Sequence, residues 1–133
     1  MPRKCKSRKI QYPPRMMGFK PFGMPLQVLE FVNLHIEEFE SLRLVNYEKK
    51  SHEEAATIMD VSRPTFTRIY NNALLKLTKA LVEGNVIKIE GGNYEFDSNW
   101  QRCKICFKLF EDEEKHQPCC GCKQYNEQEL FKI

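Results

Sequence analysis

The chain has 133 residues, with 21 Lys and Arg against 18 Asp and Glu and a formal net charge of +3. This length suits one compact domain, or one domain with a small appendage. No hydrophobic run approaches the length of a membrane span and no signal-peptide pattern precedes the body of the chain, so we expect a cytoplasmic protein.

The charge is unevenly distributed along the chain. Basic residues crowd the first twenty positions with no acid among them, and acids dominate the next forty. The region around residues 63–79 is basic again. This separation favours docking onto a polyanion by one surface, with the acidic segments turned away from phosphate.

The first 25 residues predict a basic arm without regular structure. Prolines and the Pro21-Phe22-Gly23-Met24-Pro25 stretch oppose helices and strands. A basic arm that carries Arg3 and Lys4 can reach into a minor groove or lie along phosphates. The alternative for the first ten residues is a disordered, solvated tail.

Ordered structure is expected from residue 26 onward. Residues 29–34 predict either a short strand or the approach to a helix, and their periodicity does not decide between the two. Residues 36–47 predict a helix. His35 and His52 each lie beside a helix start, so we interpret them as capping or first-turn residues rather than metal ligands.

The most informative stretch, residues 51–79, predicts two helices joined by a tight turn. Ser51 opens the first helix with a capping box, and an Ala-Ala pair lets the two backbones approach. Asp60 falls in the turn, where it must tolerate a left-handed conformation. Ser62 caps the second helix, with Pro64 in its first turn.

The second helix divides into two faces. Its predicted buried stripe comprises Phe66, Ile69, Ala73, Leu77 and Leu81. Its predicted polar face comprises Thr65, Arg68, Asn72, Lys76 and Lys79. Arg, Asn and Thr can hydrogen-bond base edges, and Lys suits phosphates, so this face is typical of a helix that reads DNA. The alternative is the solvated face of an ordinary helical hairpin.

A β-hairpin is predicted after the second helix. Residues 86–90 and 94–96 alternate between apolar and polar side chains around a Gly-Gly turn. The hairpin either packs on the helices or touches DNA as a wing, and we favour packing.

These segments together resemble a known family. The basic MPRKCKSRKI start, FKPFGMPL, and the run from IEEFESLRL to IKIEGGNY are similar to the small prokaryotic family catalogued as domain of unknown function 134. The block EEFESLRL…SHEEAA…VSRPTFTR also resembles region four of the primary bacterial sigma factors, whose helix-turn-helix binds promoter DNA. The resemblance implies DNA-contacting roles for Arg63, Thr65, Phe66, Thr67 and Arg68. Asp60 departs from the glycine usual at the turn.

The C-terminal segment carries a cysteine pattern. Two CxxC pairs, at 103–106 and 119–122, flank a twelve-residue spacer. Four thiolates at this spacing can hold Zn²⁺ tetrahedrally, so we predict a structural zinc site, with Cys120 or His116 as substitute ligands. The predicted ligands are Cys103, Cys106, Cys119 and Cys122. The alternatives are reduced, unligated cysteines or a thiol–disulfide redox pair.

The sequence therefore predicts a mainly α fold: a three-helix helix-turn-helix core with a C-terminal β-hairpin and a small zinc-ribbon-like tail. The expected domains are a basic arm at 1–25, a DNA-binding domain at 26–97 and a cysteine-rich tail at 98–133. The predicted DNA-contacting residues are Arg63, Thr65, Phe66, Thr67, Arg68, Asn72, Lys76, Arg3 and Lys4.

The predicted function is sequence-specific binding of double-stranded DNA in transcriptional regulation, without enzymatic activity. The alternative is a protein-interaction or thiol- or metal-sensing module that uses the cysteine-rich tail. RNA polymerase or another regulator is a further expected partner, and a homodimer is left open.

Overall fold

The structure is a computed structural model, and it describes residues 6–103, 108–111 and 130–132. Contacts along the chain divide it into two units, residues 1–95 and 96–133. None of the helices in the described ranges combines the length and the hydrophobicity that a membrane crossing requires.

The described part of the first unit contains three α-helices. These are α1 (Ile36–Leu42), which continues into the π-helical segment η2 (Arg43–Tyr47), then α2 (His52–Ile58) and α3 (Arg63–Glu83). The helix predicted at residues 36–47 and the two helices predicted around the turn are confirmed. Gly84 ends α3 in the left-handed conformation, with φ of 70°, which glycine adopts at low cost.

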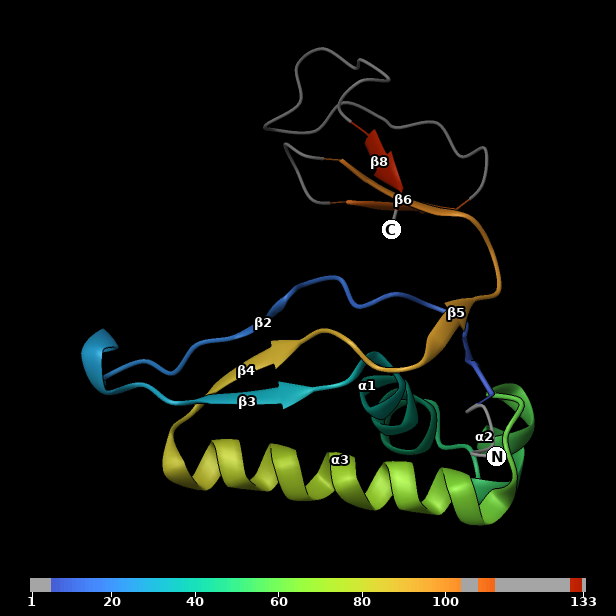
Figure 1. Ribbon diagram of the computed structural model, residues 1–133, viewed down its shortest axis with the longest axis horizontal. Coiled ribbons are helices and arrows are strands. Elements are labelled where there is room, and N and C mark those ends of the chain that lie inside the picture. The colour runs from blue at the N-terminus through green and yellow to red at the C-terminus, as the bar shows by residue number, and fades with distance from the viewer. Residues whose placement is uncertain (1–5, 104–107, 112–129, 133) are drawn as a thin grey trace, which may run out of the picture. The chain divides into compact units, whose positions relative to one another are not determined.

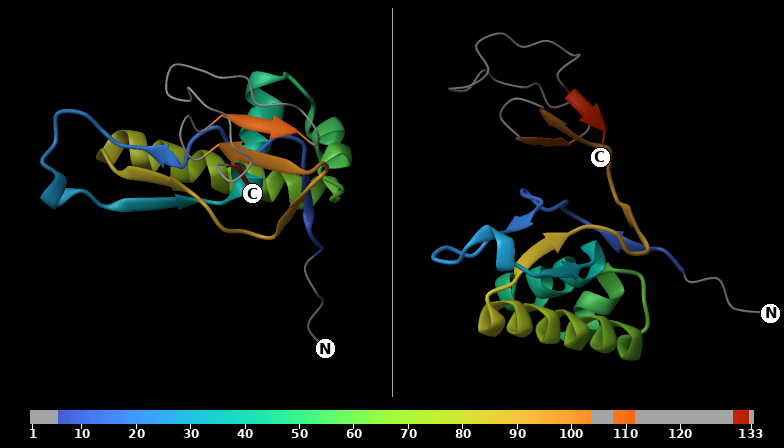
Figure 2. Two further views of the ribbon diagram at one scale, coloured as in Figure 1. Left: turned by 90° about the horizontal axis from the view of Figure 1, so that it is seen from above. Right: turned by 60° about the vertical axis from the view of Figure 1, so that its left-hand side comes forward.

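A three-stranded sheet lies along α3 in the first unit (Figures 1 and 2). Its strands are β2 (Gly18–Phe19), β4 (Val86–Ile89) and β3 (Phe31–Leu34), in that order across the sheet. β2 is antiparallel and β3 parallel to the central strand β4. Val32 and Leu34 are buried while Phe31 and Asn33 are exposed, so β3 directs one face into the core.

A second, two-stranded sheet joins the N-terminal segment to β5. β1 (Arg8–Ile10) pairs with β5 (Tyr94–Phe96), and the side chain of Ile10 is only 1% exposed. The expectation of an irregular arm is therefore wrong for residues 8–10 and 18–19. Strands of two or three residues show no alternation in the sequence, and their partners lie some seventy or more positions away, so local patterns could not reveal them.

The predicted hairpin is also wrong, because β4 and β5 do not pair with each other. Gly91 and Gly92 have φ of 76° and 103°, which only glycine adopts readily, and they direct the chain away from β4. The Gly91 carbonyl accepts a hydrogen bond from the backbone N–H of Ile36 at 3.1 Å. The turn is thus fastened to the start of α1 instead of closing a local hairpin.

The second unit contains a small antiparallel sheet. Its strands are β7 (Leu109–Glu111), β6 (Trp100–Cys103) and β8 (Leu130–Lys132), in that order. Trp100, Cys103 and Phe110 are buried within it. The prediction for residues 98–133 named no strands. β6 and β7 are near neighbours in the sequence, whereas β8 joins β6 from about thirty residues away.

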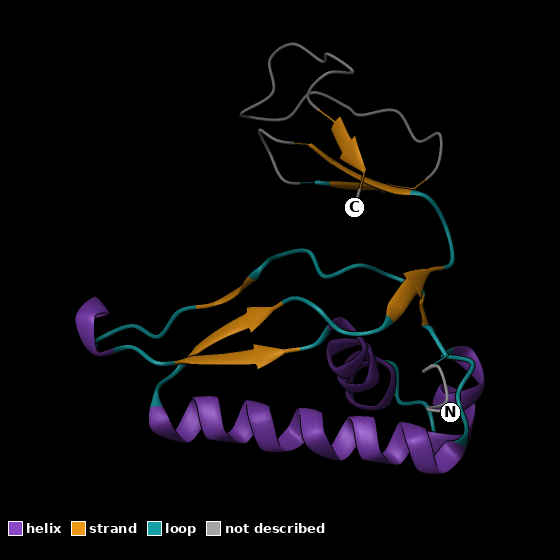
Figure 3. Cartoon of the chain, in the orientation of Figure 1, coloured by secondary structure: helices purple, strands orange, loops and turns teal. Residues whose placement is uncertain are grey.

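The prediction of a mainly α fold is therefore wrong, and the chain has a mixed α/β fold (Figure 3). The helices were recognisable because capping and apolar periodicity are local signals. The strands at 86–89 and 94–96 were also predicted, and a strand at 29–34 was one of two alternatives, but the partners of these strands were not. The zinc-ribbon-like tail was part of the same prediction, and the described part of the chain shows no metal site.

A buried carboxylate fastens the segment after β1 to α1. Glu40 is fully buried, forms an ion pair with Arg43, and accepts a hydrogen bond from the backbone N–H of Gln11 at 2.7 Å. Arg43 also donates to the Gln11 side chain at 3.0 Å, and its guanidinium lies 4.9 Å from the centre of the Tyr12 ring. Burial raises the pKa of Glu40, although Arg43 and the neighbouring backbone N–H groups oppose that rise.

Candidate nucleic-acid interface

The turn between α2 and α3 has the predicted local geometry. The hydroxyl of Ser51 accepts a hydrogen bond from the backbone N–H of Glu54 at 3.1 Å. The hydroxyl of Ser62 accepts one from the backbone N–H of Thr65 at 3.3 Å. Asp60 is left-handed, with φ of 56°. Ser51 thus marks the start of α2, and Asp60 and Ser62 mark where α2 stops and α3 begins.

The predicted buried stripe of α3 is correct in its first half only. Phe66, Ile69 and Ala73 are buried, but Leu81 is 73% exposed and Ala80 is buried instead. The first half of α3 packs against α1 and α2, whereas its second half packs against β3 and β4. The sequence indicated strands at 86–90 and, as one alternative, at 29–34, but not that they pack against α3, so the stripe was extended to Leu81 on a side of the helix that is exposed.

Three of the predicted DNA-contacting side chains are exposed on α3. Arg63 is its first residue, and Arg68 and Asn72 lie five and nine residues further on. Thr65 is half-buried beside them, and its hydroxyl accepts a hydrogen bond from Ser62 at 2.8 Å. These positions keep hydrogen-bonding groups at the surface of the first half of the helix.

Three other predicted contacts on α3 have internal partners. Phe66 is fully buried, packs edge-on to His52, and stacks on Tyr70. The Thr67 hydroxyl is 3.1 Å from His52 Nδ1, and the Lys76 ammonium is 2.6 Å from a Glu38 carboxylate oxygen. Phe66 is therefore part of the core. Arg3 and Lys4 lie outside the described residues.

Basic side chains of the N-terminal segment lie beside the first half of α3. Lys6 forms an ion pair with Asp60 at 2.9 Å, and the Lys9 backbone N–H donates to the Met59 carbonyl at 3.0 Å. A cleft of about 320 Å³ is lined by Lys6, Arg8, Asp60, Val61, Ser62 and Thr65. The N-terminal segment thus adds the cationic side chains of Lys6 and Arg8 to the surface that α3 presents.

A second, polar cavity of about 220 Å³ lies against the other side of Arg8. It is lined by Arg8, His35, Glu37, Glu38, Thr65, Arg68, Ile69, Asn72 and Lys76. Arg8 and Thr65 line both hollows, so they join the two into one surface. Sequence reasoning missed Arg8 and Lys6 as members of this site. The basic run at the N-terminus was visible, but nothing local indicated where it packs.

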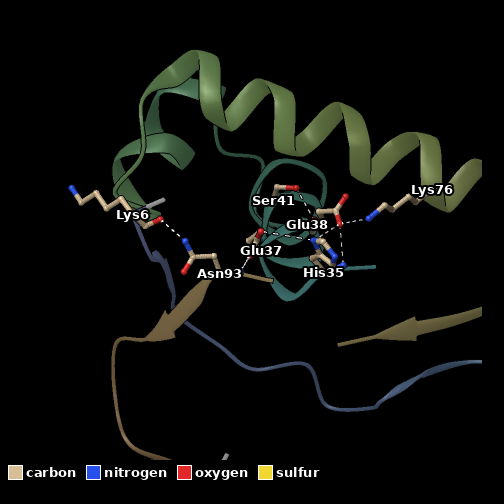
Figure 4. A network of polar contacts seen from close by, with 7 residues as sticks. All are labelled: Lys6, His35, Glu37, Glu38, Ser41, Lys76 and Asn93. Carbon is tan, nitrogen blue, oxygen red and sulfur yellow. Dashed lines mark hydrogen bonds and ion pairs between the residues drawn. The ribbon is translucent and has the colours of Figure 1, made fainter. Parts of the chain in front are cut away.

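Two acidic residues border this surface, and both carboxylates have partners (Figure 4). Glu38 accepts from the His35 backbone N–H at 3.0 Å as well as from Lys76, and Glu37 accepts from the Asn93 backbone N–H at 2.8 Å. His35 is the N-cap residue of α1, as predicted. The ammonium of Lys76 offsets the charge of Glu38, and the backbone N–H of Asn93 partly offsets that of Glu37, which reduces their repulsion of an approaching anion.

Residues 1–97 match the family described as "protein of unknown function DUF134". The chain belongs to this family. Among its relatives, a "UPF0251 protein" of Chloroherpeton thalassium is 40% identical over 135 residues, which cover 98% of this chain and 89% of the relative. A "UPF0251 protein" of Desulforudis audaxviator is 41% identical over 129 residues, covering 93% and 84%. No solved structure matches the chain.

The predicted zinc ligands of this DUF134 protein fall mostly outside the described residues. Cys103 is buried at the end of β6, whereas Cys106, Cys119 and Cys122 are not described. Within the described ranges, no three His, Cys, Asp or Glu side chains come together as metal ligands. The family match ends at residue 97, before the first of these cysteines.

Proposed function

We propose that this DUF134 protein binds double-stranded DNA in a sequence-specific manner and regulates transcription. The observation that carries the proposal is the composite surface on which Lys6 and Arg8 of the N-terminal segment flank Arg68 and Asn72 of α3. In many regulators, two helices are joined by a tight turn and the second helix, capped at its start, enters the major groove.

The chemistry of the surface assigns different tasks to its members. Arg68 and Asn72 are exposed and can each make two hydrogen bonds to a purine edge. Lys6 and Arg8 suit the phosphates beside the groove, where they add affinity without choosing sequence. In this proposal the buried side chain of Phe66 anchors α3 to the core. Lys76 is held by Glu38 instead of contacting phosphate.

The proposal is tested with Arg68→Ala, and Lys20→Ala serves as its charge-matched control. Lys20 is exposed, follows β2 and lines neither of the two hollows. After a binding site has been selected from random duplexes, we expect Arg68→Ala to weaken binding by about 1–3 kcal/mol and to relax specificity at one base pair. Lys20→Ala should change neither property. Fluorescence anisotropy at fixed salt measures both.

Arg8→Ala separates phosphate contact from base reading. It should weaken binding to selected and random duplexes by similar factors, and reduce the slope of log affinity against log salt by about one. If neither random nor selected duplex shows salt-dependent binding by the wild-type protein, the proposed function is wrong.

A further inference from the structure

We infer that the cavity of about 220 Å³ between β1, α1 and α3 binds inorganic phosphate, and that phosphate bound there competes with DNA. This cavity, called the α1–α3 pocket here, is the one that Arg8 shares with Arg68 and Asn72. The competition rests on the proposed DNA-binding function, whereas the binding of phosphate rests on the pocket alone.

Arg8 brings a buried donor without a partner to this pocket. Its Nε is shielded from solvent and donates to no acceptor among the described residues. Nor does its guanidinium form an ion pair with any of them. A buried N–H group without an acceptor is costly, and buried charges are normally paired. An anion in the pocket that Arg8 lines can supply both the acceptor and the opposite charge.

The charged side chains around the pocket favour an anion. Lys76 and Glu38 both line it and are paired at 2.6 Å, so their charges offset each other (Figure 4). Arg68, like Arg8, forms no ion pair within the described part of the chain. Two guanidiniums therefore face the single remaining carboxylate of the pocket, Glu37. The parallel N–H groups of a guanidinium match two oxygens of a phosphate.

Glu37 determines which anion fits. The residue is 7% exposed, and its Oε2 accepts a hydrogen bond from the Asn93 backbone N–H at 2.8 Å. Its Oε1 accepts no hydrogen bond from the described residues, and Nδ1 of His35 lies 4.0 Å away. An ionised carboxylate only accepts hydrogen bonds, so it disfavours an anion without a proton and accommodates one that carries an O–H group.

This requirement distinguishes inorganic phosphate from related anions. Inorganic phosphate keeps at least one O–H group at neutral pH, whereas sulfate and the phosphodiester groups of DNA have none. A phosphomonoester has mostly lost its second proton, because that proton has a pKa of about 6. Inorganic phosphate is therefore the anion that can accept from Arg8 and Arg68 and donate to Glu37.

The size and the position of the pocket agree with this ligand. Sites for drug-sized molecules have volumes of about 300–1,000 Å³, so a pocket of about 220 Å³ suits a small ion. Thr65 and Asn72 add a hydroxyl and an amide to its lining. Because Arg68 and Asn72 are also the residues proposed to read bases, phosphate bound between them obstructs the duplex.

Isothermal titration calorimetry of the full-length protein tests the inference, with sodium phosphate compared against sodium sulfate at equal ionic strength and neutral pH. We expect phosphate to bind at one site, and sulfate to bind about tenfold or more weakly, the effect of one hydrogen bond to a charged group. Glu37→Gln should abolish this difference, because it removes the carboxylate that requires a proton. Circular dichroism checks that the variant is folded.

Asn72→Asp and Asn71→Asp form a matched pair that does not threaten the core. The two residues are adjacent and exposed on α3, but Asn72 lines the pocket and Asn71 does not. Asn72→Asp adds a negative charge to the pocket and should weaken phosphate binding about tenfold or more. Asn71→Asp should leave it unchanged. Equal effects of the two substitutions overturn the inference even where Glu37→Gln does not fold.

Fluorescence anisotropy with a labelled duplex measures the competition. Phosphate should displace the duplex at lower concentration than sulfate does at the same ionic strength. A protein that binds phosphate at one site but binds no duplex rejects the proposed function and leaves the phosphate site standing. Duplex binding without saturable phosphate binding, or equal affinity for phosphate and sulfate, overturns the phosphate site. Phosphate that binds without displacing the duplex overturns the competition.

Discussion

At the scale of single residues, Asp60 has two roles in the turn before α3. Its left-handed backbone, with φ of 56°, is a conformation that most side chains disfavour and that Asp tolerates. Its carboxylate binds the ammonium of Lys6 at 2.9 Å, and this hydrogen bond and charge lower the pKa of Asp60, with a smaller effect from Lys9. One side chain therefore both forms the turn and holds the N-terminal segment beside it.

Asp60→Asn should separate these two roles, because Asn keeps the tolerance for the left-handed conformation and loses the charge. A lowered pKa in the folded protein stabilises it above the ordinary Asp value of about 4, and this contribution disappears as the pH falls through the folded-state pKa. We expect the urea midpoint of the wild type to decline more steeply at acid pH than that of the variant. Parallel curves at all pH values would contradict this role.

At the scale of elements, the Glu40–Arg43 pair determines how the segment after β1 is attached. Glu40 comes from α1 and Arg43 from η2, yet their shared partners Gln11 and Tyr12 come from the N-terminal segment. The pair therefore couples the position of β1, and with it the basic side chains of Lys6 and Arg8, to the helical core.

Arg43→Met should reveal the free-energy cost of burying the Glu40 carboxylate. Removing one partner leaves the Glu40 carboxylate buried without its cation, a change that typically destabilises by about 3–5 kcal/mol. The pKa of Glu40, already raised by burial, should rise further. A raised pKa means that the folded state gains stability as the carboxyl is protonated, so the penalty should shrink as the pH falls. Urea denaturation at neutral and acid pH measures it.

The matched control for Arg43→Met is the double variant Arg43→Met with Glu40→Gln, which has no buried charge at this position. We expect the double variant to recover part of the lost stability at neutral pH and to show little pH dependence. An equal loss in single and double variants would mean that lost packing, and not the unpaired carboxylate, explains the effect.

At the scale of the whole molecule, the chain consists of two units with separate cores. The first buries Phe66, Leu44 and Met59, and the second buries Trp100 and Phe110. The second unit is short and has few buried apolar side chains among its described residues. Such a unit often relies on a metal or another cross-link for stability.

We therefore expect the four cysteines named above to bind one zinc ion, as their spacing predicts. Metal analysis of the reduced, freshly purified protein should find one equivalent, and Cys119→Ser with Cys122→Ser should abolish it. Chelation should increase hydrogen exchange at 100–103 and leave the amides of α3 protected, because the two units have separate cores. Protein without metal, or unchanged exchange after chelation, would contradict the expectation.

The sequence by itself determined the helices and the limits of the turn. Ser51, Ser62 and Gly84 mark helix ends through contacts with neighbours a few positions away, so a linear pattern suffices to find them. The buried stripe at Phe66, Ile69 and Ala73 was also predictable, because apolar periodicity is a property of the segment.

Only the tertiary structure decided the strand pairings and the composition of the candidate site. Phe31 pairs with Val86, more than fifty positions away; the alternation at 86–90 indicated a strand there but not its partner. The position of Arg8 beside Thr65 and the exposure of Leu81 also depend on contacts between segments that are far apart in the sequence. The side of α3 that meets the sheet, the basic N-terminal segment or solvent is decided by segments distant in the sequence. The free energy of those contacts cannot be read from any single local pattern.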